Sequence, residues 1–116
     1  MNAQNVMFGL VNIGYVILSV VLSIPLVMRK IKINRFYGIR IPKSFSSEAN
    51  WLEINAYGGR QLILWSVLPL LAGIACFFVQ IDSVHKGLAP FLLGVVPVIL
   101  TVLIVLIQTL RFARKL

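Results

Sequence analysis

Charged, amide and aromatic side chains gather in one segment of this chain, which runs from Asn34 to Arg60. Arginine guanidinium groups bind carboxylates and phosphates in a two-point fashion, and asparagine amides both donate and accept hydrogen bonds. The segment is therefore the candidate site for a partner or a lipid. Its candidate residues are Asn34, Arg35, Gly38, Arg40, Pro42, Glu48, Trp51, Asn55, Gly59 and Arg60.

Three roles are open for the arginines of this segment, Arg35, Arg40 and Arg60. They could fix the membrane topology and contact lipid phosphates, which the positive-inside rule favours. They could form ion pairs with Glu48 and Glu53 and so lock the segment. They could also bind an anionic group of a partner, such as the carboxylate at the C-terminus of a peptide.

No residue pattern predicts catalysis. The chain has one cysteine, Cys76, in an apolar run, and one histidine, His85, in a short polar turn. No nucleophile–base pair, metal-ligand set or paired carboxylates accompany them. The Gly58-Gly59 pair has no phosphate-binding loop around it. We therefore expect a protein that is not an enzyme and that holds neither a metal nor a cofactor.

The candidate segment divides into a loop and a helix. Gly38 permits a turn and Pro42 favours an extended residue before it, which predicts an ordered loop. Ser46 or Ser47 can then cap a helix that Gly58-Gly59 ends or bends. One helical stripe is apolar, and the stripe beside it carries the candidate residues. The apolar stripe consists of Phe45, Ala49, Leu52 and Ala56, and its neighbour of Glu48, Trp51, Asn55 and Gly59.

This pattern predicts a short amphipathic helix that lies on the membrane surface with its apolar stripe towards the lipid. Trp51 is then expected to anchor the helix at the interface. We further expect Arg40, Trp51, Asn55 and Arg60 to form one unit, with Glu48 as the nearest carboxylate for either arginine.

Around this segment the chain is strongly apolar, with 59% hydrophobic residues, 12% charged residues and a mean hydropathy of +0.96. Three apolar runs are long enough for helices that cross a membrane, which takes about 20 residues each. We place them at about residues 6–28, 61–81 and 87–110, with the candidate segment in the loop 29–60. The prediction is a single all-α membrane domain with three transmembrane helices and the short interfacial helix.

The net charge of +8 does not indicate a nucleic-acid partner, because the basic residues flank the apolar runs. Seven of the eleven lie between the first and second runs and three follow the third run, leaving Lys86 in the short turn. The positive-inside rule then predicts a cytoplasmic loop 29–60, a cytoplasmic C-terminus and an N-terminus outside.

The stretch from residue 33 to about residue 65 resembles the SdpI family of small bacterial integral membrane proteins. That family carries an Asn-x-x-x-Gly-Ile-Arg-x-Pro motif, then a tryptophan, a histidine about four residues later and a Gly-Arg pair before a span. Asn55 stands where the family often has histidine. The matching residues are Asn34, Gly38, Ile39, Arg40, Pro42, Trp51, Gly59 and Arg60.

The resemblance implies the C-terminal three-span unit of an SdpI-type immunity protein in a bacterial cell membrane. The namesake of the family has a further membrane region before this unit. It protects its producer from a secreted peptide toxin and holds a transcriptional repressor at the membrane. Membrane lipids, a peptide toxin or a cytoplasmic regulator are therefore the expected partners, and nucleic acid is not a direct one.

Two other classes of function compete with this one. One is a membrane enzyme, for which Glu48, Asn55 and Arg60 could form a polar cluster, although no nucleophile–base pair or second carboxylate supports it. The other class is transport. The chain could be an accessory subunit or a small component of a transporter or channel. Its apolar runs contain no ionisable Asp, Glu, Lys, Arg or His, which counts against ion-coupled transport by this chain alone. Because three helices bury little of one another, a homo-oligomer or a larger membrane partner is also expected.

Overall fold

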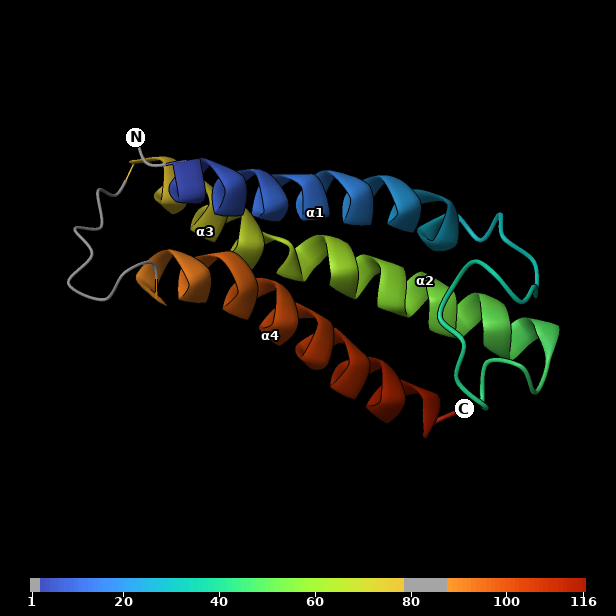
Figure 1. The fold of residues 1–116 in the computed structure, drawn as a ribbon. Coiled ribbons are helices and arrows are strands. Elements are labelled where there is room, and N and C mark those ends of the chain that lie inside the picture. The colour runs from blue at the N-terminus through green and yellow to red at the C-terminus, as the bar shows by residue number, and fades with distance from the viewer. Residues whose placement is uncertain (1–2, 79–87) are drawn as a thin grey trace.

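Four helices form an elongated bundle in the computed structural model, which describes residues 3–78 and 88–116 (Figure 1). They are α1 (Ala3–Val27), α2 (Glu48–Trp65), α3 (Val67–Phe78) and α4 (Leu88–Ala113). Helices α2 and α3 follow each other closely and pack against both α1 and α4. The predicted all-α class is confirmed.

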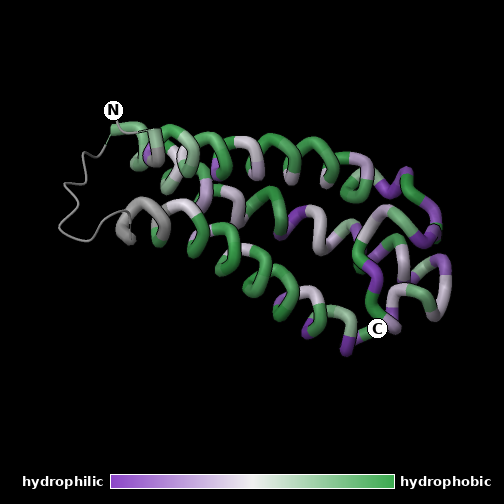
Figure 2. The backbone as a smooth tube through the Cα atoms, in the orientation of Figure 1, coloured by the Kyte–Doolittle hydropathy of each residue, from purple (hydrophilic) through white to green (hydrophobic). Residues whose placement is uncertain are grey.

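Three stretches of helix are long and apolar enough to cross a membrane: Asn5–Val27, Glu48–Phe78 and Gly94–Ala113. Hydrophobic residues predominate along α1 and α4, whereas α2 is mixed and hydrophilic residues gather at the end of the bundle that carries the loop and the C-terminus (Figure 2). The predicted multi-pass membrane architecture is thus confirmed by helix length and composition. The predicted end of the second run and the turn with His85 and Lys86 lie outside the described residues.

The first helix ends at a left-handed residue that turns the chain towards α2. The Arg29 N–H bonds to the Leu26 carbonyl at 3.2 Å, and the Lys30 N–H bonds to the Pro25 carbonyl at 3.0 Å. This pair of bonds is the Schellman arrangement, and Arg29 takes its left-handed position with a φ of 59°. A non-glycine residue there costs about 1 kcal/mol.

The structure corrects the predicted helix break at Gly58-Gly59. Helix α2 runs through both glycines to Trp65, so no separate short helix precedes the second membrane helix. A Cβ added at Gly58 would collide with Ile39, and one at Gly59 would lie 3.2 Å from the Ser23 carbonyl oxygen. These glycines therefore serve close packing instead of ending the helix.

The interruption that does occur lies at Ser66, about two helical turns after Gly59. Pro69 lacks the N–H that would bond to the Trp65 carbonyl four residues earlier, so the regular ladder is broken there. The chain recovers at once, because the Leu70 N–H bonds to the Ser66 carbonyl at 3.0 Å. Helices α2 and α3 thus act together as one membrane-crossing element.

A polar contact ties α1 to α4 at the other end of the bundle. The Asn12 side-chain amide donates to the Gly94 carbonyl at 2.9 Å and to the Phe8 carbonyl at 2.9 Å. Asn12 is fully buried, and such bonds between membrane helices contribute about 0.6–2 kcal/mol. The contact helps to hold α4 against α1 far from the candidate segment.

Candidate functional site

The loop of the candidate segment begins with a turn that Asn34 makes. Its side-chain oxygen accepts from the Phe36 N–H at 2.9 Å and from the Tyr37 N–H at 2.6 Å. Its side-chain nitrogen donates to the Lys32 carbonyl at 2.9 Å. Asparagine commonly closes turns in this way. Asn34 therefore shapes the loop, and its amide is occupied by the backbone.

Gly38 follows in a conformation that only glycine adopts easily, with a φ of 122°. A Cβ at this position would lie 2.8 Å from the Asn55 side-chain oxygen and 2.8 Å from Cζ2 of Trp51. The loop backbone thus lies directly on two side chains of α2. Glycine is needed here both for the backbone angle and for the close approach.

Asn55 holds the next residue of the loop with both ends of its amide. Its oxygen accepts from the Ile39 N–H, and its nitrogen donates to the Ile39 carbonyl at 3.4 Å and to the Trp51 carbonyl at 2.9 Å. The Asn55 side chain is 1% exposed. Buried backbone groups need partners, and Asn55 supplies both for Ile39.

Trp51 lies beneath the same loop and corrects the expected role of an interface anchor. It is fully buried, and its indole N–H donates to the Ile31 carbonyl at 2.8 Å. Phe45 packs against it with ring centroids 5.5 Å apart. Trp51 therefore fastens the chain on both sides of the Gly38 turn to α2.

The predicted orientation of this helix is wrong for the same reason. The buried face of α2 consists of Trp51, Ile54, Asn55, Ala56, Gly58 and Gly59. Phe45 and Ala49, from the stripe that was expected to face lipid, are exposed. The loop and the neighbouring helices cover Trp51, Asn55 and Gly59 of the stripe with the candidate residues, since a glycine and hydrogen-bonding side chains fit a closely packed backbone.

The start of α2 follows the prediction. Ser47 is the capping residue, and its hydroxyl accepts from the Asn50 N–H at 3.0 Å. Glu48 occupies the first turn, where a negative charge suits the positive end of the helix dipole. Glu48 is exposed.

The arginines of the segment do not pair with Glu48, contrary to expectation. Within residues 3–78 and 88–116, the side-chain ion pair joins Arg29 to Glu53. Both partners are more than 40% exposed, so water screens the pair and it adds little to stability. No local sequence pattern indicates this pair, because the two residues lie 24 positions apart and meet only through the turn that ends α1.

Arg35, Arg40 and Arg60 are exposed. The Arg40 guanidinium donates to the Arg35 carbonyl, which ties the two ends of the Phe36–Ile39 loop together. Trp51 and Asn55 therefore lie together under the loop. Arg40 directly follows Ile39, the loop residue that Asn55 binds, so the Arg40 backbone is close to them. Arg60 lies on the outer side of α2, two helical turns after Glu53. Pro42 continues the loop and is exposed.

A groove of about 410 Å³ adjoins the loop within the membrane-spanning part of the bundle. One face of α1 forms its wall, the loop residues Phe36 to Ile39 close one end, and Leu62 and Val102 contribute from α2 and α4. The Tyr37 hydroxyl donates to the Leu22 carbonyl and holds the loop against α1. The α1 residues are Tyr15, Leu18, Ser19, Leu22, Ser23 and Leu26.

One comparison with known proteins bears on this arrangement. A family model described as the SdpI/YfhL protein family matches residues 30–109. The match includes every candidate residue, α2, α3 and most of α4. No curated protein and no solved structure matches the chain.

Proposed function

This chain belongs to the SdpI/YfhL protein family, and we propose that it is a non-enzymatic immunity protein. In this proposal it protects the cell membrane against a membrane-active peptide by binding that peptide. The observation that carries the proposal is the combination of a firmly held loop with exposed cationic groups. Asn55 and Trp51 fix the loop backbone to α2, while the Arg35 and Arg40 side chains remain exposed.

The groove beside the loop suits the apolar part of such a peptide. It runs along α1 at membrane depth, and its lining is mostly leucine, isoleucine and aromatic residues. Arg35 and Arg40 flank the four loop residues that close it. A peptide that lies in the groove can therefore present an anionic group or its C-terminal carboxylate to these arginines.

We predict that Arg40→Ala abolishes or strongly reduces protection while leaving the level of the protein unchanged. The side chain is exposed, so its loss removes a positive charge and the bond to the Arg35 carbonyl while leaving the packed bundle intact. The experiment deletes the gene, restores it as wild type or variant, and challenges the cells with peptide toxins and membrane-active compounds. The readout is survival, with the membrane level of each variant measured in parallel.

Lys30→Ala and Lys115→Ala are the matched controls, since each removes one exposed charge outside the loop closure. They should protect as well as the wild type. If Arg40→Ala and Arg60→Ala accumulate normally and still protect fully, the segment is only a connector and the proposed role is wrong.

We also predict the direction in which the chain crosses the membrane. The loop and the C-terminus lie at the same end of the bundle, opposite the N-terminus (Figure 1). The basic residues at that end should keep it in the cytoplasm. Cysteines at Phe36, which is 93% exposed, and at Lys115 should react with a membrane-impermeant reagent only after the cells are opened. Cys76→Ala provides the background, and labelling of either site in intact cells contradicts this orientation.

A further inference from the structure

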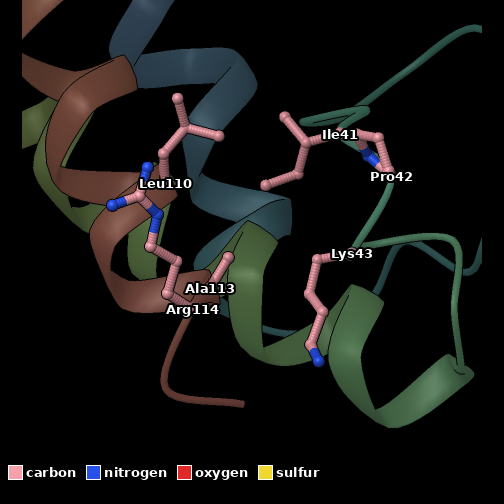
Figure 3. Close-up of a pocket in the computed structure, with 6 residues that line it drawn as sticks. All are labelled: Ile41, Pro42, Lys43, Leu110, Ala113 and Arg114. Atoms are coloured by element: carbon pink, nitrogen blue, oxygen red, sulfur yellow. The ribbon is translucent and has the colours of Figure 1, made fainter.

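A second cavity, of about 240 Å³, opens between the loop and the C-terminal end of α4. Figure 3 shows the lining residues in two groups, one on the loop and one on the last turns of α4, with the Lys43 ammonium and the Arg114 guanidinium pointing in different directions. The loop contributes Ile41, Pro42 and Lys43, and α4 contributes Leu110, Ala113 and Arg114. None of these residues touches the groove along α1.

The lining of this cavity has an amphiphilic character. Ile41, Pro42, Leu110 and Ala113 are apolar, and the polar side chains are two cations, Lys43 and Arg114. No carboxylate lines it, and the ion pair that the described residues contain lies elsewhere, between Arg29 and Glu53. The cavity therefore combines an apolar wall with two positive charges that lack a negative partner.

The position of the cavity defines what can enter it. It lies where the membrane-crossing part of α4 ends at Ala113, beside the further cations Arg111 and Lys115. From the cavity towards the middle of the membrane, the exposed side of α4 carries an apolar strip. The strip is about 10 Å long, because its ends lie seven positions apart and each helical residue adds about 1.5 Å. The strip consists of Leu103, Leu106, Ile107 and Leu110, each at least 37% exposed.

We propose that this cavity binds one anionic phospholipid of the surrounding bilayer. The exposed side chains of Arg114 and Lys43 change rotamer on binding to hold the phosphate of the headgroup, and an acyl chain lies along the strip on α4. Arginine pairs with phosphate at two points, and basic pockets at the cytoplasmic ends of membrane helices suit such headgroups. A soluble anion would satisfy the two charges but would leave the apolar strip without an occupant.

Bound lipid would also serve the loop. Lys43 lies on the loop and Arg114 on α4, so one phosphate between them links two elements that are far apart in the sequence. A ligand that binds only the folded state raises the stability of that state. Phosphatidylglycerol should therefore stabilise the folded protein more than zwitterionic phosphatidylcholine does.

The test measures thermal unfolding and lipid retention by native mass spectrometry, with purified protein in a neutral detergent. Phosphatidylglycerol should raise the melting temperature of the wild type, and phosphatidylcholine and inorganic phosphate should not. The double variant Lys43→Gln/Arg114→Gln should bind phosphatidylglycerol about tenfold more weakly, because each surface cation contributes severalfold to anionic-lipid binding. Lys30→Gln/Lys32→Gln removes the same charge away from the cavity and should retain the effect.

Leu110→Trp provides a second variant that keeps both cations but fills the cavity, and it should also weaken lipid retention. Equal losses in the two double variants would show a general effect of charge and overturn the proposal. Stabilisation by inorganic phosphate alone would assign the site to a free anion. The absence of any phosphatidylglycerol effect in the wild type would also exclude the site.

Discussion

Trp51→Ala is expected to lower the free energy of unfolding by about 3–5 kcal/mol, which is the usual cost of removing a buried tryptophan. The ring is fully buried, and its N–H is the partner of the Ile31 carbonyl. The substitution therefore leaves a cavity under the Gly38 turn and an unpaired carbonyl. Since whole domains are stable by about 5–15 kcal/mol, the variant should unfold at a much lower temperature and accumulate poorly.

Two other variants separate the causes of this loss. Trp51→Phe keeps an aromatic ring but loses the indole N–H, so it should cost less than Trp51→Ala. Phe36→Ala removes a ring that is 93% exposed and should change the melting temperature little. Thermal unfolding in detergent measures all three. A normal melting temperature for Trp51→Ala would contradict the role of this residue as the fastener of the loop.

This expectation changes how the survival experiment is interpreted. Loss of protection in Trp51→Ala would follow from unfolding, because the residue lies inside the bundle. Loss of protection in Arg40→Ala, at normal protein level, would instead report on the exposed loop as a binding surface, because the Arg40 side chain supplies charge to that loop and closes it onto Arg35. Only the second variant tests the proposed contact with a peptide.

The three membrane-crossing helices and the all-α class follow from the sequence, because runs of about 20 apolar residues have few other stable arrangements. The cap at Ser47 was also predictable, since a serine followed by an acidic residue at the start of a helical pattern is a local signal. These features depend on residues that are close in the sequence.

The arrangement of the candidate site depends on contacts between distant residues, and the sequence did not show them. A glycine pair such as Gly58-Gly59 is a local signal for the end of a helix. In this fold the two glycines instead allow Ile39 and α1 to pack closely against α2. The local pattern predicts Trp51 at the membrane surface. It does not reveal the loop that buries Trp51, because that loop is held by Asn55, which lies 16 positions after Ile39. Arg29 appeared only as a marker of topology, although it pairs with Glu53.

Gly38→Ala is the second substitution with a large expected effect, a loss of about 2–6 kcal/mol in the free energy of unfolding. An alanine cannot adopt the φ of 122° without strain, which costs of order 1–3 kcal/mol. The new Cβ would in addition lie 2.8 Å from both the Trp51 ring and the Asn55 oxygen, and overpacking of this kind costs about 1–3 kcal/mol. Neither neighbour can retreat freely, since each is held by its own hydrogen bonds.

The site of the damage can be measured as well as its size. The Ile39 amide bonds to Asn55, so its hydrogen exchange should accelerate in Gly38→Ala if the loop leaves α2. Gly14→Ala is the matched control, because Gly14 lies in α1 with no atom within 4 Å of an added Cβ. That substitution should leave stability unchanged or slightly raised. If the Ile39 amide stays protected and Gly38→Ala unfolds like Gly14→Ala, the loop is not held by the contacts between Gly38, Trp51 and Asn55.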